Sequence, residues 1–400
     1  MTTAEHPAPS YPFGPPERLD LHPRYAELRR EDPLSRVTMP HGGEAWLATR
    51  YDDIKAILAD HRFSRAVTVG NDMPRLRPPM ESENILSMDP PDHTRLRKLV
   101  SKAFTVRRIE ELRPRIQVMV DELIDELLAS GQPADLAKIV AWPLPVRVIS
   151  ELLGIPEEDR DSFRTWTGIA LSTGTETSPE EMGEAFNHLM EYMAGLIARR
   201  REVPTEDLLT GLIQARDDGD RLSEQELIVL AVTLLAAGHE TTANQIGSHT
   251  YQLLTHEGYW QRLVDEPDMV PQAVEELLRH TPMPVGADNA RVALEDIEVG
   301  GKTIRKGESV VILPLLADRD ESVFEHADEL DLDRAKNPHI AFGHGVHHCL
   351  GAPLARVELQ VALGTLTRRL PNLRLAIPAD EVPWRRDRVV RGPSELLVTW

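Results

Sequence analysis

The segment over residues 223–255 limits the possible folds most strongly, because it is compatible with a single helix of roughly 33 residues. Ser223 followed by Glu226 is a capping-box pattern, which predicts that the helix begins at Ser223. At about 1.5 Å per residue, such a helix is about 50 Å long and crosses a whole domain. Its apolar stretch, residues 227–238, has 12 residues, well short of the ~20 that a membrane span needs. The segment therefore predicts a central helix buried within protein.

Polar residues follow directly after this apolar stretch, in the middle of the predicted helix. They are Gly238, His239, Glu240, Thr241, Thr242, Asn244 and Gln245. Buried polar groups are costly unless they find partners, and the hydroxyl of Thr241 can donate to the carbonyl of Ala237. Because Gly238 weakens the helix locally, we expect a bend or an opening with a water pocket, which suits proton delivery. The alternative is a solvated stripe on a surface helix, which the apolar turns before it disfavour.

Charge and cysteine content exclude several classes of protein. The 400 residues carry a formal net charge of -20 and a single cysteine. A charge this negative repels phosphate backbones and anionic lipid headgroups, so nucleic acid and membrane surfaces are disfavoured as partners. One cysteine cannot form an intrachain disulfide, and the N-terminal residues lack the basic and apolar sections of a signal peptide. We therefore expect a soluble, cytoplasmic protein.

The whole sequence predicts a mainly α protein of the α+β class, with a smaller β-rich region. Residues 1–20 contain five prolines and no helical period, so we expect an irregular N-terminal arm, followed by a single domain over residues 21–400. Most of residues 92–255 is compatible with helices. Strands are expected within residues 34–49, as a hairpin, and at residues 297–299, 302–304, 309–313 and 396–400, and a further helix at residues 352–369.

The single cysteine, Cys349, lies in a glycine-rich loop directly before the helix predicted from residue 352. Glycines allow the backbone to approach a flat ligand closely, and amides at a helix N-terminus stabilise a thiolate, the form that binds metals. A lone cysteine is otherwise a small buried hydrophobe. A third interpretation takes His344, His347, His348 and Cys349 as ligands of zinc or non-haem iron, but so many ligands in so short a loop are sterically crowded.

The loop resembles the haem-binding loop of the cytochrome P450 family, in which the cysteine is the axial ligand of the iron. The shared spacing is Phe-Gly-x-Gly-x-His-x-Cys-x-Gly, and it includes Phe342, Gly343, His347, Cys349 and Gly351. Further motifs of the family occur in the right order, so the resemblance extends over roughly residues 25–400. They are His93-x-x-x-Arg97, the segment Ala-Gly-His-Glu-Thr-Thr at residues 237–242, and Glu276-x-x-Arg279.

The resemblance implies the P450 fold and a haem b cofactor whose iron is bound by Cys349. It also implies that the haem propionates are held by His93, Arg97, Arg291 and His347. The guanidinium fork of arginine is well suited to carboxylates. His347 stands where arginine is common in the family, so its contact could be weaker or depend on pH. Further residues expected to contact the haem are Ala237, Phe342, Gly343 and Gly351.

The pair Glu276 and Arg279 has two interpretations. Residues three apart share a helix face, and such pairs are usually weak surface salt bridges. In the family the pair is completed by a second arginine in the meander before the cysteine loop, and Arg334 is the expected counterpart here. His93 and Arg97, four residues apart, could likewise be no more than a solvated helix face.

The activity that the resemblance implies is that of a haem-thiolate monooxygenase, which inserts one oxygen atom from O2 into a C–H bond or an alkene. Thr241 is expected to hold the activated oxygen and its water, and Glu240 to relay protons from solvent. The chain looks most like actinomycete oxygenases that modify polyketides, especially macrolides, in antibiotic biosynthesis. The alternatives are a steroid or xenobiotic hydroxylase of the same family and a non-catalytic haem-binding sensor, which has no use for a proton relay.

By analogy with the family, the substrate walls are expected in five segments, many of whose residues are apolar. These are residues 84–88, 165–179, 234–237, 284–287 and 389–390. Apolar walls with small residues suit a bulky lipophilic substrate.

Electrons are expected from a separate protein, since the sequence has no glycine-rich nucleotide-binding fingerprint. We expect a ferredoxin, reduced by a ferredoxin reductase. Residues 93–109 contain no acidic residue and six cationic ones, namely Arg95, Arg97, Lys98, Lys102, Arg107 and Arg108. In an otherwise acidic chain this basic segment could steer an acidic ferredoxin, or it could be a solvated helix face.

Overall fold

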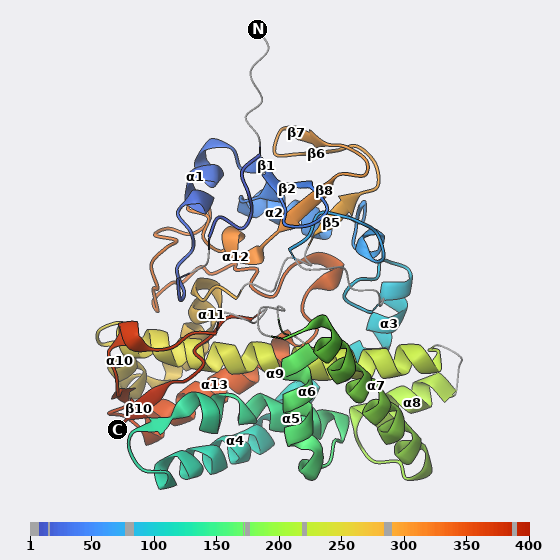
Figure 1. The fold of residues 1–400 in the computed structure, drawn as a ribbon. Coiled ribbons are helices and arrows are strands. Elements are labelled where there is room, and N and C mark those ends of the chain that lie inside the picture. Colours follow the sequence, from blue (N-terminus) through green and yellow to red (C-terminus); the bar gives the residue numbers. More distant parts are fainter. Residues whose placement is uncertain are drawn as a thin grey trace. The chain divides into compact units, whose positions relative to one another are not determined.

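The structure is a computed structural model that describes residues 8–14, 17–76, 84–170, 172, 177–217, 222–283, 290–385 and 390–400. Internal contacts divide the chain into two compact units. We call Met1–Thr94 with Leu278–Cys349 the β unit, and Arg95–Leu277 with Leu350–Trp400 the α unit. Figure 1 labels their elements. The single domain expected over residues 21–400 stays a prediction.

A five-stranded sheet with the strand order β1-β2-β8-β5-β3 organises the β unit. β1 and β2 form the predicted antiparallel hairpin, and Gly42 and Gly43 in its turn have φ angles of 74° and 89°, which glycine adopts readily. β2 pairs with β8 in parallel, and β6 and β7 form a separate antiparallel pair. The strands are β1 (Leu34–Thr38), β2 (Glu44–Ala48), β3 (Phe63–Ser64), β5 (Arg291–Ala293), β6 (Ile297–Val299), β7 (Lys302–Ile304) and β8 (Ser309–Ile312).

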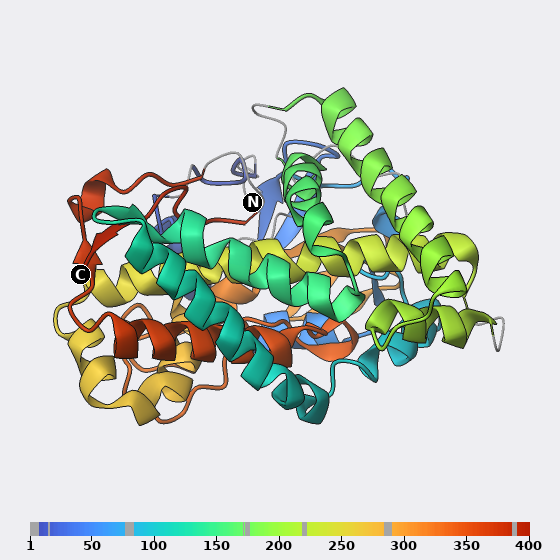
Figure 2. The same ribbon diagram turned by 90° about the horizontal axis from the view of Figure 1, so that it is seen from below.

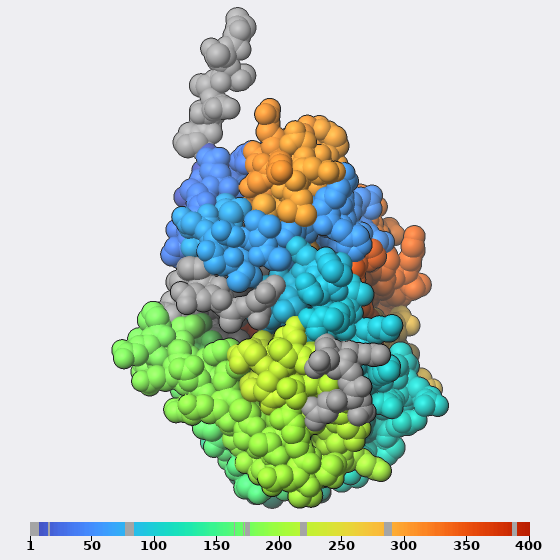
Figure 3. Space-filling model, turned by 90° about the vertical axis from the view of Figure 1, so that its right-hand side faces the viewer, coloured from blue at the N-terminus to red at the C-terminus, as the bar shows by residue number. Residues whose placement is uncertain are grey.

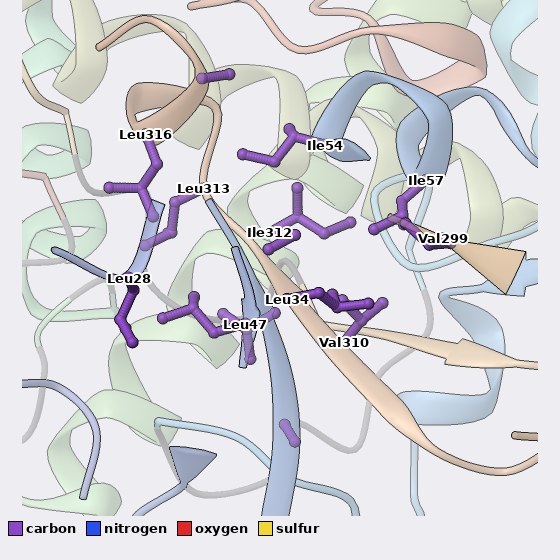
Figure 4. Packing of buried hydrophobic residues seen from close by; sticks show 14 of the residues in the cluster. Leu28, Leu34, Leu47, Ile54, Ile57, Val299, Val310, Ile312, Leu313 and Leu316 are labelled. Carbon is purple, nitrogen blue, oxygen red and sulfur yellow. The ribbon is translucent and has the colours of Figure 1, made fainter. Parts of the chain in front are cut away.

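Helix α2 (Tyr51–Ala59) packs against this sheet, because Ile54 and Ile57 lie three residues apart on one helix face and are fully buried. Tyr11, from the predicted N-terminal arm, joins the same core, and its N–H donates to the carbonyl of Thr38 (2.9 Å). Figure 4 shows Ile54 and Ile57 close to strand residues Leu34, Leu47 and Ile312. The other helices of the β unit are α1 (Arg24–Glu31), η1 (Ala66–Thr68), α12 (Pro314–Ala317) and η5 (Gly345–His347).

The α unit is a bundle of helices packed around α9 (Glu224–Thr255) (Figure 2). The helix predicted at residues 352–369 is α13, which lies against α4, and the strand predicted near the C-terminus is β10. The helices that surround α9 are α4 (Val106–Ala129), η2 (Ala137–Ala141), α5 (Pro143–Leu153), η3 (Glu157–Asp159), α6 (Arg160–Ala170), α7 (Pro179–Glu202), α8 (Leu208–Asp217), α10 (Tyr259–Asp265), η4 (Pro267–Met269) and α13 (Ala352–Arg369).

The remaining elements complete the chain. Two helices, α3 (Asp92–Ser101) and α11 (Val270–His280), each begin in one unit and end in the other. A small sheet in the α unit has the order β4-β10-β9. Its strands are β4 (Ala134–Asp135), β9 (Arg374–Leu375) and β10 (Leu397–Thr399), and η6 (Ala379–Glu381) lies between the last two in sequence.

The central helix α9 confirms the strongest prediction from the sequence. Ser223 is its N-cap, and its hydroxyl accepts a hydrogen bond from the N–H of Glu226 (3.1 Å) while the Glu226 carboxylate accepts one from the N–H of Ser223 (2.6 Å). The helix then runs for 32 residues, without a break at Gly238. Among the described residues, α9 is the one helix long and apolar enough to cross a membrane, but 56% of its most apolar window is buried. Buried core helices pass the same test of length and composition.

Candidate functional site

The cysteine loop is a tight turn closed by a hydrogen bond from the N–H of Cys349 to the carbonyl of Phe342 (2.8 Å). Gly343 and Gly345 have φ angles of 74° and 71°, in the left-handed region that favours glycine. The side chain of Cys349 is exposed. The loop therefore presents a thiol rather than burying it, against the interpretation as a small core residue.

Gly345 also has a packing role that the sequence did not suggest. A Cβ atom at this position would lie 2.3 Å from the carbonyl oxygen of Leu58, in the last turn of α2. At Gly343, by contrast, the nearest neighbour of a Cβ atom would be the carbonyl oxygen of His347, 4.0 Å away. We expected these glycines to make room for a flat ligand, whereas Gly345 makes room for α2.

A buried carboxyl group supports the segment that leads into the cysteine loop. Oδ1 of Asp318 accepts a hydrogen bond from the N–H of Ile340 (2.7 Å), and its Oδ2 has no hydrogen-bond partner among the described residues. Burial raises the pKa of Asp318 to about 7, although the charges of His339, Arg279 and Arg319 act in the opposite direction. The carboxyl group is therefore partly protonated inside the folded protein at neutral pH.

We predict that Asp318→Asn makes the stability of the protein less dependent on pH. The unfolded chain loses the Asp318 proton near pH 4, whereas the folded chain keeps it up to about pH 7. The free energy of unfolding of the wild type therefore falls as the pH rises through this window. Asparagine stays neutral, so the variant should be more stable than the wild type at about pH 8, by roughly 2 to 4 kcal/mol. Urea unfolding at about pH 5 and about pH 8 measures this; a variant less stable at the higher pH would contradict it.

Three of the residues predicted to hold the haem propionates lie in the β unit. The rings of His93 and His347 are in contact, with centroids 4.2 Å apart. Arg291 is 5% exposed, and burial together with the nearby Arg65 lowers its pKa to about 9, against the opposing effect of Asp89. The carbonyl of Asp89 accepts a hydrogen bond from the N–H of His93 (3.0 Å). Asp89 thus connects the histidine pair with the two arginines.

This group of side chains fits a cofactor that carries carboxylates. A buried guanidinium next to a second one is unfavourable unless anions compensate both charges. Asp89 alone is a weak compensation, because its carboxylate already accepts hydrogen bonds from the N–H of Arg65 (2.9 Å) and the hydroxyl of Ser64. Arginine and histidine donate strongly to carboxylates, as the propionates of haem would require. Sequence reasoning missed Arg65 and Asp89, since neither stands in a motif.

Helix α9 offers an accessible stripe in an otherwise buried middle section. Ala237 is exposed, and Leu234 and Thr241 are partly exposed on the same helix face. The hydroxyl of Thr241 donates to the carbonyl of Ala237 (3.1 Å), as predicted. Glu240, directly before Thr241, is buried. The α unit therefore places a small residue and a hydroxyl on an open face, next to a buried acid.

The predicted site residues are divided between the two units, so their assembly into one haem site stays a prediction. Arg97 lies half-buried on α3, one turn after His93, and Gly351 is the N-cap of α13. The β unit holds His93, Arg291, Phe342, Gly343, His347 and Cys349, and the α unit holds Arg97, Ala237, Glu240, Thr241 and Gly351. Of the predicted substrate walls, residues 171, 173–176, 284–287 and 389 lie outside the described residues.

Glu276 and Arg279 on α11 are buried, with 1% and 2% exposed, so their interpretation as a surface salt bridge is wrong. The guanidinium of Arg279 donates to three backbone carbonyls, those of Asp318 (2.8 Å), Ala327 (2.7 Å) and Glu329 (2.8 Å). It thereby fastens the segment that precedes the cysteine loop. Arg334 donates to the carbonyls nine and eight residues before it (2.8 and 3.3 Å), and its role as the partner of the pair stays a prediction.

The zinc or non-haem iron interpretation finds no ligand set. Within the described part of the chain, no three His, Cys, Asp or Glu side chains are grouped so that they could hold a metal ion. That part includes His344, His347, His348 and Cys349. A single exposed thiol instead suits haem, whose iron needs one axial ligand from the protein.

Comparisons with known proteins agree with this geometry. A family model described as Cytochrome P450 matches residues 175–400. The chain is 52% identical to mycinamicin IV hydroxylase/epoxidase of Micromonospora griseorubida, with 100% of both chains covered, and 52% identical to nocardicin C N-oxygenase of Nocardia uniformis subsp. tsuyamanensis, with 98% of both covered.

A solved structure shows that the likeness extends to the fold. The LnmA cytochrome P450 hydroxylase of Streptomyces atroolivaceus has a TM-score of 0.93 and 50% identity to this chain, and the match covers 98% of this chain and 100% of that one. The predicted mainly α P450 fold is confirmed, and with it haem b as the cofactor. The chain belongs to the cytochrome P450 family and is a haem-thiolate monooxygenase.

Proposed function

We propose that this monooxygenase acts in the cytoplasm and inserts its oxygen atom into a C–H bond or an alkene of a macrolide or related polyketide. The observation that carries the proposal is the open stripe of α9, where the small side chain of Ala237 lies beside the hydroxyl of Thr241. Small apolar residues leave room for a bulky lipophilic substrate. Support for the substrate class comes from a relative, the mixed-function P450 MycG, solved with mycinamicin IV (TM-score 0.91, 51% identity).

A second candidate is a steroid-like substrate. A vitamin D(3) 25-hydroxylase of Pseudonocardia autotrophica is 42% identical over 94% of this chain, which supports the steroid alternative at lower similarity. The haem-sensor alternative is wrong at the level of class, because the chain is a monooxygenase.

The residues of the chain would divide the work as follows. When bound, haem activates dioxygen and delivers one oxygen atom to the substrate. Cys349 supplies the thiolate ligand, and Arg291 with His347 binds the propionates. On α9, the hydroxyl of Thr241 holds a water molecule at the open face, and the buried Glu240 passes protons to it from solvent.

A screen of substrate-induced spectral changes tests the substrate class. The holoenzyme is titrated with macrolides, polyenes, steroids and nocardicins, and the shift of the haem Soret band is followed. We expect macrolides to give the type I shift at the lowest concentrations, and turnover with them to yield a product heavier by one oxygen atom. Binding of steroids alone would overturn the polyketide assignment in favour of the second candidate.

An acidic ferredoxin, reduced by its reductase, is proposed as the electron donor. In the basic segment Lys98, Lys102, Arg107 and Arg108 are exposed, whereas Arg95 is ion-paired with Glu226. Val106 lies among these cations and is 66% exposed. An apolar residue surrounded by charges is typical of a protein interface, and Figure 3 shows α3 and the segment after it at the surface.

Charge reversal of this segment should weaken the reaction with ferredoxin. We expect Lys102→Glu combined with Arg108→Glu to raise the KM for ferredoxin about tenfold at low salt, because steering by opposite charges is lost, and less at high salt, where screening already weakens it. Lys306→Glu is the control, since Lys306 is exposed but lies in the β6–β8 region. Equal effects of both reversals would show that net charge, rather than this segment, matters.

A further inference from the structure

His239, between Gly238 and Glu240, is 3% exposed and forms hydrogen bonds at both ring nitrogens. Nδ1 lies 2.9 Å from the carbonyl oxygen of Leu235, which can only accept, so Nδ1 carries a proton. Burial lowers the pKa of His239, although the hydrogen bond to Leu235 opposes this. The ring is therefore neutral near pH 7, and its Nε2 accepts a hydrogen bond.

The donor to Nε2 is Thr167 of α6, whose side chain is fully buried. Its hydroxyl oxygen lies 3.1 Å from Nε2 of His239 and 2.6 Å from the carbonyl oxygen of Phe163. A hydroxyl has a single proton, so these two acceptors share it. The share that goes to His239 joins α6 to α9, between residues that are 72 positions apart in the sequence.

The neighbours of His239 on the same turn of α9 make no such connection. At Gly238 a Cβ atom would lie 2.8 Å from Cγ1 of Ile149, so α5 leaves no space for a side chain. The hydroxyl of Thr241 donates within α9, to Ala237. His239 therefore supplies an interhelical hydrogen bond at the turn that carries the proposed proton relay.

Helix α6 is itself packed firmly against α7. The ring centroids of Phe163 and Tyr192 are 4.5 Å apart, and those of Trp166 and His188 are 5.6 Å apart. Closely packed helices transmit displacements to their neighbours. A shift of the α6–α7 pair therefore reaches α9 at His239.

We propose that His239 is a positioning residue: its hydrogen bond with Thr167 places the turn that carries Glu240 and Thr241 and thereby sets the efficiency of proton delivery. The proposal rests on the proposed relay role of Glu240 and Thr241. It concerns a side chain that touches neither substrate nor cofactor in this account.

The test compares Thr167→Val with Thr167→Ser in the holoenzyme. Valine has the shape of threonine without the hydroxyl, and serine keeps the hydroxyl. Two quantities are measured: amide hydrogen exchange in residues 236–242, and product formed per electron pair consumed. With valine we expect exchange about fivefold faster and product about fivefold lower, the factor that corresponds to the ~1 kcal/mol of an ordinary hydrogen bond. Serine should restore both.

Thr367→Val is the matched control. The Thr367 side chain is buried, and its hydroxyl donates to the carbonyl of Leu363 (3.0 Å) in its own helix, α13. This variant should leave both quantities at wild-type values. A role of Thr167 in general packing alone would give the two valine variants the same effect and would overturn the proposal.

A double-mutant cycle with His239→Leu identifies the bond itself. If His239 and Thr167 act through one hydrogen bond, the double variant should lose about fivefold, as each single variant does, rather than the product of the two losses. Independent effects would overturn the proposal. Its failure is distinct from failure of the relay, because the relay is tested separately by Thr241→Ala, whose effect does not depend on Thr167.

Discussion

Replacing Gly345 by alanine is expected to destabilise the protein by at least about 4 kcal/mol and to abolish haem retention. The new Cβ atom would lie 2.3 Å from the carbonyl oxygen of Leu58 and 3.0 Å from its carbonyl carbon, and backbone atoms cannot rotate away. The φ angle of 71° adds strain of about 1–2 kcal/mol. Because Cys349 closes the same loop, the displacement moves the thiol. Urea unfolding and the haem content of the purified protein measure the two effects.

The matched control for this substitution is Gly301→Ala, in the turn between β6 and β7. Gly301 has a similar φ angle, 77°, but no neighbour lies within 4 Å of a Cβ atom there. We expect only the backbone strain, about 1–2 kcal/mol, and normal haem content. If the two variants lost equal stability, the contact between Gly345 and α2 would have no special weight.

Replacing Thr241 by alanine is expected to uncouple electron consumption from product formation. Without its hydroxyl, the open face of α9 no longer holds the water through which Glu240 delivers protons. General acid catalysis contributes about a hundredfold or more to such steps, so product per electron pair should fall at least about tenfold while hydrogen peroxide rises. Parallel assays of product, peroxide and electron donor consumed give the ratio.

A second threonine of α9 provides the control for this experiment. The hydroxyl of Thr233 donates to the carbonyl of Val229 (2.7 Å), the same local bond that Thr241 makes with Ala237. Thr233→Ala should leave the coupling unchanged, and Thr241→Ser should retain most of it. Wild-type coupling in Thr241→Ala would show that the relay does not depend on this hydroxyl.

Features decided by neighbours in the sequence were predicted well. The capping box at Ser223 and Glu226 defines the start of α9, because both partners lie within one helical turn. The paired glycines Gly42 and Gly43 marked the turn of the first hairpin. The spacing around Cys349 identified the family, since it depends on a single tight loop. In each case the physical constraint is contained in a few consecutive residues.

Features that depend on tertiary packing were not predicted. The polar cluster on α9 drew attention to His239, but its partner Thr167 is 72 positions away, and no pattern connects the two. Arg65 beside Arg291 and Leu58 beside Gly345 likewise meet only because the β unit folds them together. Burial, which raises the pKa of Asp318, is equally a property of the folded chain.

The central claim is that the thiolate of Cys349 is the axial ligand of the haem iron. The most direct test is the absorption spectrum of the reduced carbon monoxide complex, recorded for the wild type and for Cys349→His. We predict the red-shifted Soret band of thiolate ligation in the wild type and its absence in the variant, which should still bind haem through imidazole. A wild type without that band, or a variant that keeps it, would contradict the account.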